Sequence, residues 1–596
     1  MPFLNAFFES TLPRRTQPII FEKREMRFVT KLLPVLLRET WSKAGERADR
    51  YRSMALVGVT LSTLASGVAY ANGLTPNRAL NPAARDLQQL QDDVQRGRLE
   101  KEIERRQQLR ESEQKKAEPS SEKLPSSNFE FQLNEVTHSP STVLTPEEIQ
   151  SAVKPFIGLT VTMADLQTML DAINGIYREK GYVVCEARLA PQRIRQGKLF
   201  ITLIEGKTGR VAVTGQTHTN ESFITNAFTL TPGDVANYRD LSNDLVHFNM
   251  THDIELQVDL KAGEEAGTTD YAILVNEPAN WTASLFSDST GSPSTGRYRL
   301  GASVTNRSLL GRRDSLNLLG MLSEGSQSVM AGYSVPLNSR GTRLAANLSL
   351  GEVETSQAGD IKGDSTFYSL RLDHPFYADA NGKLTGFLEA SRQLSETTFF
   401  GVTINDTQID TYRLGLEQLY LTDQTVTYGQ VSVETAKAQE KTFNESWQQQ
   451  ILKANLMWRA SLNPDWRVTL SGAMQTVLGG DPLMSAQYFY LGHTSGVRGY
   501  ENDFISAEDG AYANAELTWN PQGAWYGFFG FVDAGRLGSN TPYSDKMLLS
   551  AGLGTTITLG NNLQLTGTAA FPIKRNFAHV EEIDKARFDF SLVATW

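Results

Sequence analysis

The chain has 596 residues, of which 40% are hydrophobic, and its net charge is −10 at neutral pH. This length is more than one hydrophobic core usually organises, so we expect several domains. The single cysteine, Cys185, excludes an internal disulfide and any cysteine-based zinc cluster. The nearest histidines, His247 and His252, lack a metal-ligand spacing, and no common hydrolase motif occurs. We therefore expect no metal, no cofactor and no enzymatic activity.

The first 71 residues have the three parts of a secretory signal peptide. Several arginines precede a short apolar stretch at 54–71, which ends in an A-x-A site formed by Ala69 and Ala71. These small side chains predict cleavage after residue 71. The basic lead is unusually long, so the start of the chain could be Met1 or Met26. Polar residues within the stretch disfavour the alternative, a membrane anchor.

The remaining chain is acidic. Residues 1–71 hold 11 Lys and Arg and 6 Asp and Glu, which leaves 46 basic and 61 acidic residues and a net charge of about −15. This balance does not suit a nucleic-acid partner. Beyond the apolar stretch the sequence has no uninterrupted apolar run long enough for a transmembrane helix.

A charged helix is expected at 81–116, where Asn81 supplies an N-cap and Pro82 a first helical residue. Its apolar stripe is thin and consists of Leu87, Leu90, Val94 and Leu99. Such a helix suits water, a polar channel or a partner surface better than a hydrophobic core. Residues 117–128 follow as a linker rich in proline and serine.

Residues 129–278 predict two successive compact units, each with the order β-α-α-β-β. In the first unit we expect strands at 129–133, 181–184 and 198–204, a helix that opens with a capping box at Thr145, and a second helix at 163–180. In the second unit we expect strands at 209–213, 254–260 and 271–275 and helices at 221–229 and 239–248. The repeated order indicates two small domains of the same kind.

Residues 281–596 contain no convincing helix and predict about sixteen strands with alternating sides. In one of them Leu300, Ala302 and Val304 interleave with Arg299 and Ser303. One polar and one apolar face suit a membrane barrel with a wet lumen, although a soluble sandwich alternates in the same way. The signal peptide, the segment length and the even strand number favour a closed barrel wide enough for an aqueous channel.

The last strand has one apolar face, formed by Phe588, Phe590, Leu592, Ala594 and Trp596. This face, with an aromatic residue at the chain end, resembles the assembly signal of outer-membrane barrels.

The longest connection between the expected barrel strands lies near 478–509. It contains Val497, Arg498, Gly499 and Tyr500 in succession. Loops of this length usually carry function or are disordered. Phe531 and Asp533 share one face of a later strand. Because an ionised aspartate is costly against lipid, we expect Asp533 to face the lumen.

These features resemble the outer-membrane transporters of two-partner secretion, the haemolysin and haemagglutinin secretion/activation family. Residues 177–182 and 197–206 resemble the first POTRA domain of that family, and 245–263 resemble the end of the second. The Val-Arg-Gly-Tyr motif resembles the loop that folds into the barrel in this family. The resemblance implies that Arg498 of this loop pairs with Asp533 of the Phe531-containing motif, and a guanidinium suits a bidentate carboxylate contact.

The resemblance implies a mostly β chain with five parts. These are an extended signal peptide at 1–71, a plug-like N-terminal helix and linker at 72–128, periplasmic α+β POTRA domains at 129–206 and 207–278, and a transmembrane barrel of about sixteen strands at 279–596. The long loop near 478–509 folds inward.

The implied function is an outer-membrane translocator whose POTRA domains recognise an unfolded partner exoprotein in the periplasm and whose barrel exports it. The implied partners are a haemolysin, an adhesin or a contact-dependent toxin, together with outer-membrane lipid, lipopolysaccharide and the barrel-assembly machinery. The main alternative is a barrel-assembly factor of the same superfamily, which usually carries more POTRA domains. An outer-membrane enzyme and a passive porin are weaker alternatives, because the first lacks a catalytic motif and the second needs no periplasmic domain.

Overall fold

The computed structural model describes residues 82–113, 130–355, 361–442, 444–493, 496–502, 504–538, 541, 543–560, 562–577 and 583–596, and of 107–113 it describes the backbone. The expected cleavage site at Ala69 and Ala71, the N-cap Asn81 and the linker at 117–128 lie outside these residues. Among the described helices, none combines the length and apolar character needed to cross a membrane.

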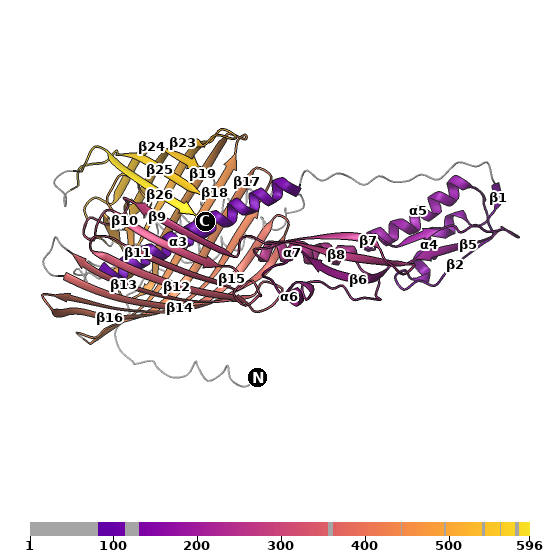
Figure 1. The fold of residues 1–596 in the computed structure, drawn as a ribbon, viewed down its shortest axis with the longest axis horizontal. Helices are drawn as coiled ribbons and strands as arrows, with labels where there is room; N and C mark the ends of the chain where they lie inside the picture. Colours follow the sequence, from indigo (N-terminus) through magenta and orange to yellow (C-terminus); the bar gives the residue numbers. More distant parts are fainter. Residues whose placement is uncertain are drawn as a thin grey trace, which may run out of the picture. The chain divides into compact units, whose positions relative to one another are not determined.

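A closed barrel of sixteen antiparallel strands forms the C-terminal part of the described chain (Figure 1). In order around the barrel the strands are β9 (Trp281–Asp288), β10 (Arg299–Asn306), β11 (Ser315–Leu322), β12 (Ser326–Pro336), β13 (Arg343–Thr355), β14 (Ile361–Asp379), β15 (Gly382–Phe399), β16 (Val402–Leu421), β17 (Thr425–Glu440), β18 (Glu445–Ser461), β19 (Trp466–Gly480), β22 (Gly510–Trp519), β23 (Tyr526–Leu537), β24 (Met547–Leu559), β25 (Leu563–Pro572) and β26 (Arg587–Thr595). The prediction of a mostly β chain with a sixteen-stranded barrel is confirmed.

The alternation of the strands separates a lipid-facing side from a lumen-facing side. Leu300 in β10 is 57% exposed, whereas the adjacent Arg299 is only 12% exposed at its side chain. Arg299 faces inward, where its guanidinium lies 3.5 Å from Asp93 of the helix α3 (Pro82–Glu113). Apolar side chains outside and charged side chains inside are the arrangement of a membrane barrel with a polar lumen.

The barrel closes where β26 meets β9, and Trp596 takes part in this closure. Ser591 to Thr595 pair with Asp288 to Ser284. The backbone of Trp596 then exchanges two hydrogen bonds with Ala283, at 2.8 Å and 3.0 Å. The side chains of Phe588, Phe590 and Trp596 are exposed on the outer face. The final residue therefore completes the ladder as well as the aromatic face.

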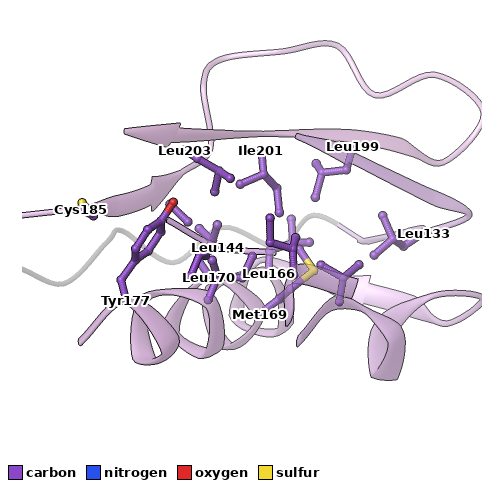
Figure 2. Packing of buried hydrophobic residues seen from close by; sticks show 14 of the residues in the cluster. Leu133, Leu144, Leu166, Met169, Leu170, Tyr177, Cys185, Leu199, Ile201 and Leu203 are labelled. Carbon is purple, nitrogen blue, oxygen red and sulfur yellow. The ribbon is translucent and has the colours of Figure 1, made fainter. Parts of the chain in front are cut away.

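The first compact unit packs two helices against short strands. A three-stranded sheet has the order β2 (Glu135–His138), β5 (Lys198–Ile204), β4 (Glu186–Arg188), and β1 (Glu130–Gln132) pairs with β3 (Thr160–Thr162). The helices are α4 (Pro146–Val153) and α5 (Met163–Glu179), and each begins with a capping box, at Thr145 and Thr162. Their apolar faces meet the sheet in a core that includes Met169, Tyr177 and Ile201 (Figure 2).

The strand expected at 181–184 is wrong, because these residues form the turn that ends α5. Gly181 has a φ of +92°, the left-handed conformation that commonly follows a helix end. The N–H of Tyr182 donates to the carbonyl of Tyr177 at 2.8 Å, and the N–H of Cys185 donates to that of Tyr182 at 3.2 Å. These bonds keep the apolar run out of the sheet, so β4 begins at Glu186. Burial raises the pKa of the Cys185 thiol to about 11, which keeps the thiol neutral.

The second compact unit repeats the first. Its sheet has the order β6 (Lys207–Thr214), β8 (Thr268–Asn276), β7 (Glu255–Ala262), and its helices are α6 (Glu221–Thr225) and α7 (Tyr238–Thr251). In both units a parallel pair, β2 with β5 or β6 with β8, is extended by one antiparallel strand. The shared strand order and directions identify two copies of one α+β fold.

A carboxylate directly after the last strand fastens each unit. Glu205 accepts hydrogen bonds from the N–H of Thr142 at 2.8 Å, the hydroxyl of Thr142 at 2.6 Å and the hydroxyl of Tyr177 at 2.9 Å. Glu277 accepts equivalent bonds from the backbone of Thr217 and His218, at 3.2 Å and 2.9 Å. Burial raises the pKa of Glu205, but hydrogen bonds from Ser141, Thr142 and Tyr177 outweigh burial and hold its pKa below the ordinary value.

Removing Trp596 should lower the amount of assembled barrel. The deletion removes two closing hydrogen bonds and the indole, whereas Trp596→Ala removes the indole alone. An unpaired backbone group facing lipid costs several kcal/mol, so we expect the deletion to be the more harmful change. Heat-modifiable mobility on gels measures the folded fraction, and Trp525→Ala, at a similarly exposed tryptophan, is the control. Normal levels in both Trp596 variants would show that the terminal residue does not contribute to closure.

Candidate functional site: the long loop and the helix inside the barrel

The long connection between β19 and β22, the eleventh and twelfth barrel strands, is folded. It contains the turn η2 (Ser485–Gln487) and a hairpin of β20 (Phe489–Leu491) with β21 (Ile505–Ala507). Its apolar side chains pack with those of the barrel wall in one buried cluster, formed by Leu491, Val497, Tyr500, Ile505, Ala507, Leu537, Leu548 and Phe577. The loop therefore lies against the inner side of the barrel.

Polar contacts fasten the base of this loop to the strand that precedes it. The amide of Gln475 in β19 donates to the carbonyls of Gln487 and Glu508, at 2.8 Å and 3.0 Å. The carboxylate of Glu508 in turn accepts from the N–H of Leu483 at 2.7 Å. Both ends of the loop are thus tied to one side chain of the wall.

Arg498 and Asp533 are brought together in a bidentate ion pair. Nε of Arg498 donates to Oδ2 of Asp533 at 2.8 Å, and Nη2 donates to Oδ1 at 3.0 Å. The backbone N–H of Arg498 also donates to Oδ2, at 3.0 Å. The Asp533 side chain is fully buried and that of Arg498 is 22% exposed. Three hydrogen bonds to one buried carboxylate determine both the position and the orientation of the loop tip.

Two neighbouring residues complete the arginine site. Nη1 of Arg498 donates to Oε2 of Glu516 at 2.8 Å, and its guanidinium carbon lies 3.5 Å from the ring centroid of Phe531. Glu516 in β22 stands directly opposite Phe531 in β23, so the arginine contacts adjacent strands. Sequence reasoning did not identify Glu516. The sequence feature that could have identified it is its charge on the polar face of β22, where Tyr512, Asn514 and Thr518 alternate with alanine and leucine.

Val497, Gly499 and Tyr500 hold the motif against the wall. Val497 is fully buried, and its N–H donates to the carbonyl of Gly492 at 2.8 Å. The hydroxyl of Tyr500 lies 2.9 Å from the carbonyl of Leu549 in β24 and 2.8 Å from that of Lys574, just after β25. Gly499 has a φ of +95°, a conformation that a residue with a Cβ adopts only under strain. This turn directs Arg498 and Tyr500 to different strands.

The helix α3 lies along the inner wall of the barrel. It contacts β12, β13, β14 and β15. Glycines of the lumen face make room for it, because a Cβ on Gly351 would lie 2.9 Å from Leu87, and one on Gly363 would lie 3.3 Å from Ala83. Leu87, which the thin apolar stripe contained, is fully buried. The sequence left three environments open for this helix, namely water, a polar channel or a partner surface. In the structure the helix lies in the barrel lumen, which is a polar channel.

Charged and polar contacts hold α3 to the wall along its length. Glu102 accepts from Nζ of Lys383 in β15 at 2.7 Å, and Asp93 lies 3.5 Å from Arg299. Near its start, the carbonyl of Ala84 accepts from the amide of Gln393 at 3.3 Å. These contacts are of the kind that water can replace, unlike those of a hydrophobic core.

The long loop and α3 also contact one another. Ala84 packs in one buried cluster with Met484 and Ala486 of the loop and with apolar residues of β16 and β17. The guanidinium of Arg85 lies 5.9 Å from the ring centroid of Tyr490. Together the two segments fill part of the lumen. In the described part of the chain no group of three or more His, Cys, Asp or Glu residues is arranged to hold a metal ion.

Loss of either partner of the Arg498–Asp533 pair should loosen the loop. Breaking a buried pair costs about 3–5 kcal/mol and an exposed pair about 0–1 kcal/mol, and the partly exposed arginine places this pair between them. We expect Arg498→Ala and Asp533→Ala to raise hydrogen exchange at β20 and β21, and the double variant to be less than additive. Arg392→Ala breaks the Arg392–Asp410 pair, which does not contact the loop, and is the control. Purely additive effects would contradict a direct coupling.

Comparison with known proteins agrees with this architecture. The model of the family described as haemolysin secretion/activation protein ShlB/FhaC/HecB matches residues 267–557, and that of the ShlB-type POTRA domain matches residues 131–206. The heme/hemopexin transporter protein HuxB of Haemophilus influenzae (strain 86-028NP) is 23% identical over 480 residues, which cover 76% of this chain and 84% of HuxB. The outer membrane transporter CdiB of Escherichia coli O6:K15:H31 (strain 536 / UPEC) is 24% identical over 482 residues, 74% of this chain and 79% of CdiB.

A solved structure of CdiB from Escherichia coli has the same fold, with a TM-score of 0.63 at 19% identity, over 88% of this chain and all of that chain. The matched family models cover the first compact unit and the barrel from β9 into β24, and this range contains the loop with Arg498 and the wall with Asp533. The chain therefore belongs to the ShlB/FhaC/HecB haemolysin secretion/activation family, the two-partner secretion transporters of the bacterial outer membrane.

Proposed function

We propose that this transporter binds one unfolded exoprotein with its two POTRA domains in the periplasm and passes it through the barrel. The observation that carries the proposal is the nature of the lumen contents. A sixteen-stranded barrel is wide enough for an aqueous channel, and the described segments inside it are one helix and one loop. Polar contacts hold a large part of both segments, so they can leave or shift without unfolding the wall.

The POTRA domains offer strand edges to an extended chain. In the sheet β2-β5-β4 the outer strands are β2 and β4, and in the sheet β6-β8-β7 they are β6 and β7. An unfolded segment can add to such an edge through backbone hydrogen bonds, which need no particular sequence. This mode of binding suits recognition before folding.

The partner that we propose is a haemolysin, an adhesin or a contact-dependent toxin. Support comes from the curated relatives, whose names include a hemolysin transporter of Serratia marcescens and a heme/hemopexin transporter of Haemophilus influenzae. We further propose that the apolar outer face meets outer-membrane lipid and lipopolysaccharide, and that the barrel-assembly machinery recognises the face of Phe588, Phe590 and Trp596. Export requires no change of a covalent bond, and we propose that the chain is not an enzyme.

The role in export is tested by comparing the proteins that cells release with and without this chain. We expect loss of one large secreted protein and unchanged levels of other outer-membrane barrels, because the chain carries two POTRA units and a helix in the lumen. The Arg498→Ala variant should insert but release less of the same protein. A general fall in other barrels would instead support the barrel-assembly alternative.

The helix α3 should act as a plug. Deleting residues 82–113 should raise ion conductance in planar bilayers, because the helix fills part of the lumen. Gly351→Leu should raise it in part, since a side chain there collides with Leu87. Gly320→Leu is the matched control, because a Cβ at Gly320 meets no atom within 4 Å. Unchanged conductance after the deletion would contradict the plug role.

A further inference from the structure

The C-terminal end of α7, in the second POTRA domain, binds two arginines of α3. The last carbonyls of a helix have no partner within the helix. Here Nη1 of Arg106 donates to the carbonyl of Asn249, and Nη2 donates to that of Met250 at 2.8 Å. Nη2 of Arg105 donates to the carbonyl of His252 at 3.1 Å. A cation is favoured at this position because the helix dipole is negative at its C-terminus.

Arg106 is buried, and its charge has partners on both α7 and α3. Arg106 is only 5% exposed, although it belongs to a highly charged helix. Glu102, one turn earlier, lies 3.6 Å from Arg106 and also accepts from Lys383 of the barrel at 2.7 Å. Burying a guanidinium is costly unless its charge is matched, and the α7 carbonyls and Glu102 supply partners for the two terminal nitrogens of Arg106.

An apolar cluster lies beside these polar contacts and joins three parts of the chain. Ile103 of α3 and Met250 of α7 are buried with Leu419, Leu421 and Val426 of the barrel. Ile103 is fully buried. The end of α7 therefore contacts one helical turn of α3 through the apolar Ile103 and the cationic Arg105 and Arg106.

The same end of α7 is attached to the barrel. Directly after it, Asp253 accepts two hydrogen bonds from Arg313, at 2.8 Å from Nε and 2.5 Å from Nη2. Arg313 is 1% exposed and belongs to the turn between β10 and β11. His247 of α7 contacts the carbonyl of Arg340, in the next such turn, at 3.1 Å. While these bonds persist, α7 holds the arginines of α3 at the mouth of the barrel.

We propose that the end of α7 is a latch that retains α3 in the lumen, with Arg106 as its positioning residue. The proposal rests on the plug role of α3. A displacement of the second POTRA domain by a bound exoprotein separates the α7 carbonyls from Arg106, and the buried guanidinium then keeps Glu102 but loses these hydrogen bonds. The cost of this loss is removed when α3 moves into water. Binding in the periplasm and opening of the barrel are thereby coupled through one helix end.

The latch is tested on the full-length protein without an exoprotein, by conductance in planar bilayers. Charge-assisted hydrogen bonds of this kind shift an equilibrium by roughly tenfold to a hundredfold, so Arg106→Ala should raise the fraction of open time by about that factor. Arg106→Lys, which keeps the charge but loses the fork of donors, should have a smaller effect. Lys101→Ala removes a charge from an exposed position of the same helix and is the control.

A second measurement separates failure of the latch from failure of the plug. Ile103→Cys and Met250→Cys in a Cys185→Ser background should cross-link on oxidation, and Arg106→Ala should slow this reaction severalfold. If removal of α3 raises conductance but Arg106→Ala changes neither open time nor cross-linking, the plug stands and the latch is wrong. If removal of α3 has no effect on conductance, the plug fails and the latch proposal falls with it.

Discussion

The requirement that every backbone hydrogen bond be satisfied in lipid underlies the rest of this structure. The hydrocarbon core offers no water to an unpaired N–H or C=O group, so a sheet that spans it must close on itself. Here the ladder is complete because β26 pairs with β9 and Trp596 continues the pairing to Ala283. Large apolar side chains, such as Leu300 and Leu388, lie on the outer face, and charged side chains such as Arg299 and Glu389 lie inside.

Closure with sixteen strands creates a lumen that the wall side chains do not fill by themselves. The chain occupies it with α3 and the long loop, which are held in different ways. The loop tip is anchored by an ion pair, in which the fully buried Asp533 receives three hydrogen bonds from Arg498, and Gln475 and Tyr500 add hydrogen bonds between the loop and the wall. The helix is held by dispersed contacts, such as Glu102 with Lys383 and Leu87 against Gly351. A concentrated anchor suits a part that stays, and dispersed contacts suit a part that leaves.

The periplasmic units add surfaces for recognition to this arrangement. Each copy of the fold leaves strand edges at its sheet, and each is fastened by a carboxylate after its last strand, Glu205 or Glu277. The second copy does more than the first, because its helix α7 contacts both the barrel turns and α3. The C-terminal end of α7 thus connects the periplasmic domains to α3, which fills part of the lumen.

Local patterns in the sequence determined the element types and the side of each strand that faces lipid. Alternation around Leu300, the capping box at Thr145 and the strand count required only neighbouring residues, because these features follow from local geometry and from the polarity of lipid and water. The apolar run at 181–184 led to the wrong prediction of a strand, because Gly181 adopts a positive φ that ends α5 and places the apolar residues in a turn. Tertiary structure alone decided which distant groups meet: Glu516 at Arg498, the lumen as the environment of α3, and the α7 carbonyls at Arg106. The partners are 18 positions apart for Glu516 and Arg498, 144 for Met250 and Arg106, and 281 for Lys383 and Glu102 of α3, so the packing of separate elements, and no local pattern, brings them together.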